Sequence, residues 1–145
     1  MIEYSIAEKK HLEQILQLYK QLRPDEDPLI IDKAAKIWEK IEQNNIKYFI
    51  AGENSKIIAS CYICIIPNLT RNGKSIGFIE NVVTDKEYRR KGIGKKIMEN
   101  AVKYAREQNC YKVSLQSGNK RIDAHGFYES LGFDGNSKRA YEKIL

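Results

Sequence analysis

Residues 75–96 place a strand, a basic turn and a helix directly one after another. The run 75–84, SIGFIENVVT, is nearly all apolar and rich in strand-favouring residues, which is typical of a central strand buried on both faces. The turn YRRKGIGKK then carries Gly92 and Gly94 among five cations, and helical apolar spacing begins at Gly92. Such a turn offers free backbone N–H groups at the positive end of a helix, where anions bind. The segment therefore predicts a pyrophosphate cradle, with an ordinary basic loop that caps a helix as the alternative.

Two familiar phosphate loops are excluded by spacing. A Walker A loop requires Ser or Thr after Gly-Lys, whereas Gly94 is followed by Lys95 and Lys96. The dinucleotide fingerprint requires a third glycine where this chain has Ile97. The turn is therefore expected to belong to a different class of phosphate-binding site.

The rest of the chain alternates between strand and helix patterns. Strands are expected at 2–6, 47–52, 56–66, 75–84, 111–116 and 139–145, and helices at 12–22, 31–41, 93–105 and 124–131. This order predicts a mixed α/β fold. Because the 145 residues contain no repeat and no linker-like stretch, we expect one domain over residues 1–145.

Composition narrows the function classes. The net charge of +6 makes an anionic partner plausible, and no stretch is long and apolar enough to span a membrane. The N-terminus lacks the build of a signal peptide, so we expect a soluble cytoplasmic protein. Three cysteines suit no disulfide framework, and the pair Cys61 and Cys64 lies on an expected strand without partners for a metal site. We therefore expect no metal and read these cysteines as core residues.

Two segments together resemble a known family. Arg89-x-x-Gly92-x-Gly94, after VVTDKEY, is similar to the acetyl-CoA motif of the GNAT-type N-acetyltransferases. The segment 118–133, GNKRIDAHGFYESLGF, resembles the second marker of that family, and the order of elements agrees along the chain. The resemblance implies a GNAT-type fold with about six to seven strands and four helices, with central strands splayed at the cofactor site. It also implies acetyl-CoA as co-substrate.

The resemblance implies how acetyl-CoA is held. The main chain of residues 82–84 would pair with the pantetheine arm, and residues 89–95 would hold the pyrophosphate. The expected cofactor-binding residues are Val82, Val83, Thr84, Arg89, Arg90, Lys91, Gly92, Ile93, Gly94, Lys95 and Asn119. Asn119 departs from the family pattern because it lies five residues before Ala124, where the family commonly has about three.

Two residues are candidates for catalysis. Glu80 interrupts an apolar strand and could accept a proton from the attacking amine, because an amine with a pKa near ~10 is mostly charged at neutral pH. The alternative is that a bulge or sheet edge turns Glu80 to solvent or pairs it with a cation. Tyr128 lies where the family carries a tyrosine, which implies proton donation to the departing thiolate; alternatively, it only fills the core. We expect direct transfer in a ternary complex.

The acceptor is expected to be a small cationic amine. In the resembling family the region between the first two helices helps to form the acceptor cleft, and here it contains Asp25, Glu26 and Asp27, which with Asn81 form the expected substrate-binding set. The alternative is a solvated acidic turn. A protein amine as acceptor, a non-catalytic acyl-CoA sensor and a basic nucleic-acid binding module are the other readings, although we expect no nucleic acid and no membrane partner. The family resemblance also makes a homodimer an arrangement to expect.

Overall fold

The computed structural model describes residues 1–145, which divide into two compact units, Met1–Ser114 and Leu115–Leu145. The elements are β1 (Glu3–Ile6), α1 (Leu12–Leu22), α2 (Ile31–Glu42), β2 (Ile46–Glu53), β3 (Lys56–Ile66), β4 (Ser75–Thr84), α3 (Ile93–Glu107), β5 (Cys110–Leu115) and α4 (Ile122–Ser130). Three short 3-10 turns, η1 (Lys9–His11), η2 (Arg71–Gly73) and η3 (Lys86–Tyr88), join them. The mixed α/β fold with four helices is thus confirmed, whereas the prediction of one domain stays a prediction.

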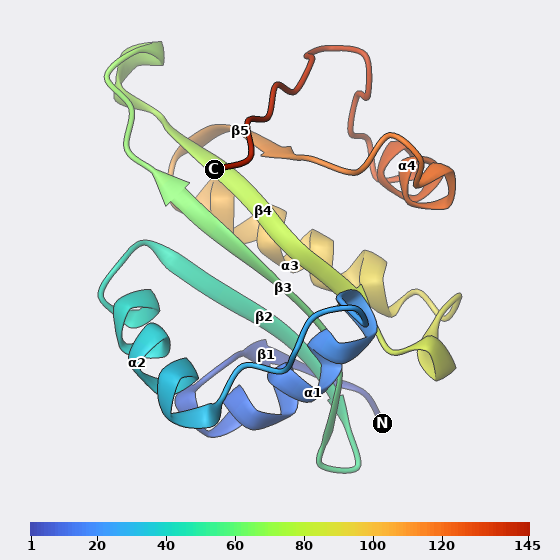
Figure 1. Cartoon of the computed structure of the whole chain (residues 1–145). Helices are drawn as coiled ribbons and strands as arrows, with labels where there is room; N and C mark the ends of the chain where they lie inside the picture. Colours follow the sequence, from blue (N-terminus) through green and yellow to red (C-terminus); the bar gives the residue numbers. More distant parts are fainter. The chain divides into compact units, whose positions relative to one another are not determined.

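The sheet has five strands in the order β1-β2-β3-β4-β5 (Figure 1). The first four pair antiparallel with their sequence neighbours. The expected count of six to seven strands was too high, since residues 139–145 form no strand and their side chains are exposed. An alternating pattern gives this segment strand propensity, but a strand exists only where a neighbouring strand accepts its backbone hydrogen bonds.

Helices cover both faces of the sheet in the first unit. Successive strand residues point to opposite faces, and Tyr48 packs on Trp38 of α2 while its neighbour Phe49 packs on Tyr104 of α3. The helices α1 and α2 therefore share one face, and α3 lies on the other (Figure 1). Each of these three helices turns some apolar residues into the core, whereas Ile31 at the start of α2 is 46% exposed.

Gly77 lets α3 approach the sheet closely. A Cβ at this position would lie 3.0 Å from the side chain of Ile63 and 3.4 Å from that of Ala105. A larger residue would push the helix away from β4, the strand that leads into the glycine turn. The position of α3 is thus set by a small residue on the sheet.

The cysteines behave as core and half-buried residues. All three are free thiols, and Cys61 is fully buried on β3, where burial raises its pKa to about 12. A thiol that stays protonated at neutral pH is a poor nucleophile. No helix of the chain combines the length and the apolar character that a membrane crossing needs.

Candidate active site

A β-bulge interrupts β4 where its sequence turns polar. Ser60 pairs with Val83 and Tyr62 pairs with Glu80, so that Asn81 and Val82 together face one residue of β3. Asn81 has a φ of +52°, in the left-handed region that residues other than glycine seldom adopt. A bulge bends the strand and frees backbone groups from the ladder. The sequence left open that a bulge in this strand sets the direction of the Glu80 side chain. Such a bulge exists, and it begins at the residue after Glu80.

Glu80 continues a row of aromatic side chains across the sheet. Tyr48 pairs with Tyr62 and Tyr62 pairs with Glu80, so that these three side chains lie on one face, the face that α1 and α2 cover. The rings of Tyr48 and Tyr62 are 5.0 Å apart, and that of Trp38 is 5.2 Å from Tyr48. Burial, followed by the negative charge of Glu80, raises the pKa of Tyr62 to about 12, so that it remains a neutral phenol. Glu80 is half-buried and borders an uncharged aromatic surface.

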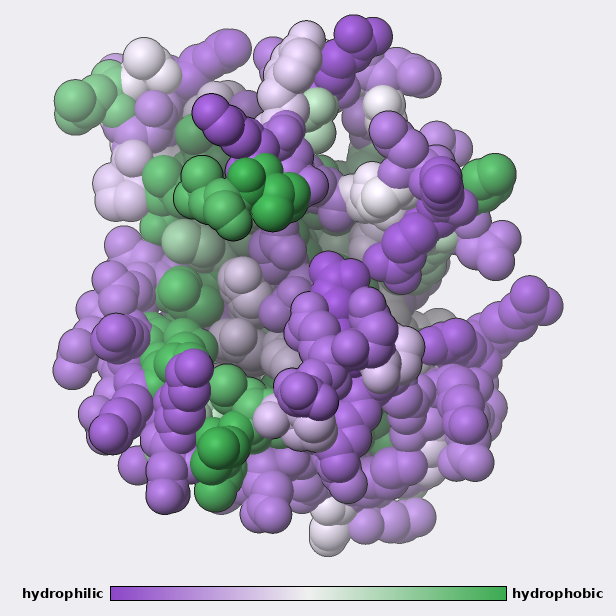
Figure 2. Space-filling model, in the orientation of Figure 1, coloured by the Kyte–Doolittle hydropathy of each residue, from purple (hydrophilic) through white to green (hydrophobic).

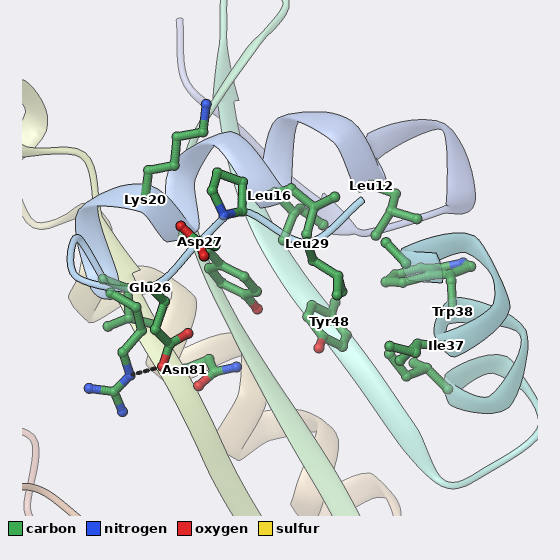
Figure 3. A pocket seen from close by; sticks show the side chains of 17 residues that line it. Leu12, Leu16, Lys20, Glu26, Asp27, Leu29, Ile37, Trp38, Tyr48 and Asn81 are labelled. Carbon is green, nitrogen blue, oxygen red and sulfur yellow. Dashed lines mark ion pairs between the residues drawn. The ribbon is translucent and has the colours of Figure 1, made fainter. Parts of the chain in front are cut away.

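A cavity of about 450 Å³ opens on the same face between α1, α2 and the loop that joins them (Figure 3). We call it the α1–α2 cavity. Its volume lies in the ~300–1,000 Å³ range of small-molecule sites. Glu26 and Asp27 line it from the loop, and Asn81 lines it from the bulge. Three of the four residues expected at the acceptor site thus meet at one cavity, whereas Asp25 is exposed and does not line it.

Aromatic lining residues were not anticipated as site residues. Tyr19 and Trp38 lie on the apolar stripes of α1 and α2, and Tyr48 lies on β2. The Tyr19 hydroxyl is buried and makes no well-formed hydrogen bond, although Tyr48 and Asn81 are its polar neighbours. Burial raises the pKa of Tyr19, which keeps its proton in place. The only sign of this cavity in the sequence is that position 19, on the apolar stripe of α1, carries a tyrosine where a leucine would fill the core.

The glycine turn lies at the far end of β4 and leads into α3. Gly92 has a φ of +78° and directly precedes the helix, and the amide of Lys96 makes the first helical bond, 3.1 Å from the Gly92 carbonyl. No side chain caps this helix end, and Gly92 is exposed. A Cβ built on Gly92 would meet nothing within 4 Å. The Cβ side of Gly92 thus borders open space at the start of α3, which fits an anion cradle.

The cations of the turn are held at its surface. Arg89 donates a hydrogen bond to the Thr84 carbonyl at 3.2 Å, and the Lys91 ammonium lies 5.0 Å from the centre of the Tyr88 ring. Arg90 is exposed and adopts a left-handed φ of +61°. Lys95 is exposed on the first turn of α3, whereas Ile93 is buried and anchors the helix. Charges and backbone donors therefore gather at one helix end.

Two predicted site residues belong to the second unit. Tyr128 lies on α4, with its ring 5.3 Å from that of Phe127 and 6.3 Å from that of Phe133. Asn119 is exposed in the turn before this helix, where the His125 Nε2 lies 2.8 Å from the Gly118 carbonyl oxygen. Tyr128 thus has the packed ring that the sequence suggested. The roles of both residues stay predictions.

Comparisons with known proteins agree on one family. The model of the acetyltransferase (GNAT) family matches residues 12–133. A Trypanosoma brucei brucei protein named glucosamine 6-phosphate N-acetyltransferase is 33% identical over 99% of this chain and 93% of its own length. The solved structure of a putative acetyltransferase from Agrobacterium tumefaciens superposes with a TM-score of 0.94, at 34% identity and 99% coverage of both chains. The Arabidopsis thaliana glucosamine-6-phosphate N-acetyltransferase structure, at 23% identity, shares the fold with a TM-score of 0.88 over 100% of this chain and 99% of its own.

Proposed function

The chain belongs to the acetyltransferase (GNAT) family, and we propose that it transfers the acetyl group of acetyl-CoA to the primary amine of a small molecule by direct attack in a ternary complex. The observation that carries this proposal is the continuity of β4, which runs from a bulge beside the α1–α2 cavity into the exposed glycine turn. One strand thereby links a place for the amine to a place for a pyrophosphate.

The glycine turn would hold the diphosphate of acetyl-CoA. Uncapped amides after Gly92 and the cations Arg90, Lys91 and Lys95 supply donors and positive charge. The main chain of Val82 to Thr84 would pair with the pantetheine arm, and Asn119 stays a proposed cofactor-binding residue. This strand lies directly before the turn, so that an extended arm on it would bring the thioester to the bulge.

Glu80 would assist the attack of the amine. An alkyl ammonium with a pKa near ~10 must lose a proton before its nitrogen can attack, and Glu80 stands one residue from the bulge. The freed amine nitrogen then forms a bond to the carbonyl carbon, and a backbone N–H released by the bulge would stabilise the oxyanion. The proton that the ammonium loses before the attack passes to Glu80, directly or through water. The second proton, which the nitrogen loses after the C–N bond has formed, passes to solvent water, from which Tyr128 would regain the proton that it gives to sulfur.

Tyr128 would complete the transfer. When the C–S bond breaks, the electron pair goes to sulfur, and the phenol of Tyr128 would supply the proton that converts the thiolate of coenzyme A into a thiol. A phenol with an ordinary pKa of ~10 is close enough in acidity to a thiol for efficient transfer. The products are an amide and free coenzyme A.

The acceptor is proposed to be a small cationic amine, for which Glu26 and Asp27 at the α1–α2 cavity would supply carboxylate partners. An amino sugar phosphate is the second candidate, since the Trypanosoma relative that spans the chain carries that substrate in its name. A protein amine, an acyl-CoA sensor without turnover and a nucleic-acid binding module remain alternatives of other classes.

A thiol-release assay tests the proposal directly. The purified chain is incubated with acetyl-CoA and each member of a panel of amines that includes glucosamine 6-phosphate, a polyamine and an arylalkylamine, and free coenzyme A is measured. Amine-dependent thiol release with formation of the matching amide supports an N-acetyltransferase. Tight binding of acetyl-CoA without turnover of any amine would favour the sensor.

A further inference from the structure

The α1–α2 cavity has apolar walls. Leu12 and Leu16 line it from α1, Ile37 and Trp38 from α2, and Leu29 from the loop above Tyr48 (Figure 3). Most of the remaining lining residues are aliphatic or aromatic as well. Apolar walls favour a ligand in proportion to the apolar surface that it removes from water. A hydrophilic body such as a sugar ring would gain little from these walls.

The cavity is too large to be a packing fault between the two helices. Protein interiors seldom contain voids larger than a water molecule, whereas this space measures about 450 Å³ and opens to the surface. Its lining residues Leu29 and Ile37 remain 38% and 39% exposed. Figure 2 shows hydrophobic side chains at the surface over this part of the first unit. The open space with apolar lining is therefore available to a ligand.

The uncharged polar groups of the cavity lie close together beside the bulge. Asn81 contributes an amide, Tyr48 contributes a hydroxyl, and the buried Tyr19 hydroxyl lacks a well-formed hydrogen bond. A buried hydroxyl without a partner loses free energy that a bound donor or acceptor would restore. Ligand N–H groups could donate to these three oxygens. The cavity thus has a polar end beside the strand that we assign to the thioester and an apolar end between the helices.

The charges around the cavity are balanced. Lys20 and Arg23 line it together with Glu26 and Asp27, and the Arg23 Nε lies 3.9 Å from the Glu26 Oε1 (Figure 3). Sites for phosphate esters usually present an excess of cations or a helix N-terminus aimed at the ligand. Two cations matched by two carboxylates offer no such excess. This arrangement does not favour a phosphorylated acceptor.

We propose that the acceptor is a primary amine with an aromatic or branched aliphatic body, whose amine reaches the polar end at Asn81 while its body packs between α1 and α2. This inference rests on the proposed acetyltransferase function and specifies its substrate class. The inference predicts that the enzyme selects amines by the apolar surface of their bodies, which would contact the rings of Trp38 and Tyr48. Glucosamine 6-phosphate would then be a poor acceptor for this chain.

The test separates binding from turnover. Isothermal titration of the full chain saturated with coenzyme A measures the affinity for 2-phenylethylamine, 3-methylbutylamine, spermidine and glucosamine 6-phosphate, because no acetyl group is present to transfer. The thiol-release assay with acetyl-CoA then gives kcat/KM for the same amines. We expect the two apolar amines to bind at least about tenfold more tightly than the two hydrophilic ones, and to show the highest kcat/KM.

Variants of the lining identify the cavity as the place of binding. Leu29→Ser and Ile37→Ser change partly exposed side chains and should fold. Each should raise the KM for 2-phenylethylamine by about three- to tenfold and leave the KM for acetyl-CoA unchanged. Ile30→Ser is the matched control, because Ile30 is 72% exposed, adjoins Leu29 in the chain and does not line the cavity.

The outcomes keep the two proposals apart. If apolar amines bind and the lining variants weaken them, but no amine is acetylated, the substrate-class inference stands for binding and the proposed function fails. If glucosamine 6-phosphate or spermidine is bound and acetylated in preference to the apolar amines, the function stands and this inference is overturned. Equal effects of the Ile30 and Leu29 variants, or no binding of either apolar amine, would also overturn it.

Discussion

The Lys56 ammonium lies 2.8 Å from the Asp85 Oδ2, and this ion pair joins the β2–β3 hairpin to the segment that leads into the glycine turn. The Asp85 side chain is only 5% exposed, whereas that of Lys56 is 55% exposed. The Asp85 Oδ1 also accepts a hydrogen bond from the Glu87 amide at 3.0 Å, which caps η3. The side chain of Gln21 on α1 accepts a hydrogen bond at 2.9 Å from the backbone amide of Lys86, the residue that follows Asp85. One buried carboxylate therefore fixes the point from which the chain turns toward Gly92.

Replacing Asp85 should destabilise the first unit. Asp85→Ala removes a cap and a charged hydrogen bond inside a nearly buried site, so that we expect a loss of about 1–3 kcal/mol in the free energy of unfolding, measured by urea denaturation. Glu107→Ala is the matched control, since its pair with Lys103 spans 4.0 Å at the surface. That variant should change stability by less than about 0.5 kcal/mol. Equal losses in both variants would refute the special role of Asp85.

Stability should also depend on pH through Asp85. The hydrogen bond from Lys56 is the main cause that lowers the pKa of this carboxyl below its ordinary value of 3.8. A carboxyl with a lowered pKa in the folded state stabilises the fold above its ordinary pKa, and this contribution is lost as the pH falls through the folded value. We therefore expect the free energy of unfolding to fall below about pH 4 in the wild type and to fall less in Asp85→Asn. If the free energy of unfolding falls equally at low pH in both proteins, Asp85 is not the source of this pH dependence.

Local signals in the sequence predicted much of the fold and part of the site. The strand 75–84, the glycine turn and the helical stripes are local patterns, and each has a counterpart in the structure. Cavity walls and core use the same helical periodicity, so that the apolar pattern of residues 31–41 does not show that Trp38 lines a cavity. The bond between Lys56 and Asp85 joins residues 29 positions apart, and no local pattern encodes such a pairing. The bulge at Asn81 likewise depends on the register with β3, which tertiary packing sets.

Gly92→Glu should abolish binding of acetyl-CoA without unfolding the chain. The new side chain would enter the open space beside Gly92 and oppose the pyrophosphate with a negative charge, while the positive φ adds a backbone cost of about 1 kcal/mol. Gly73→Glu is the matched control, because Gly73 has a φ of +76°, equally open surroundings and a place in the β3–β4 connection. Titration calorimetry with coenzyme A measures both variants. Wild-type affinity in Gly92→Glu would defeat the cradle assignment.

Tyr128→Phe should lower turnover more than it weakens cofactor binding. The change removes only the hydroxyl and keeps the ring that packs on Phe127 and Phe133. Loss of the proton donor is expected to reduce kcat by about tenfold or more, with the dissociation constant of coenzyme A changed by less than about threefold. Tyr141→Phe, at a side chain with 84% exposure, is the control and should retain wild-type kcat. A Tyr128→Phe enzyme with full turnover would leave this ring a packing role alone.

Glu80→Gln should slow acetylation in a way that depends on the basicity of the amine. If Glu80 accepts the proton of the attacking ammonium, its loss lowers kcat/KM for an alkylamine with a pKa near ~10 by about tenfold to a hundredfold. An amine of low basicity is already unprotonated at neutral pH and needs no base before it attacks, so that its rate should fall far less. Glu99→Gln, at an exposed position on α3, is the control and should act on both amines like the wild type. A structural role of Glu80 would slow both amines equally, because a distorted bulge impairs every acceptor, and that result would remove Glu80 from the proton transfer.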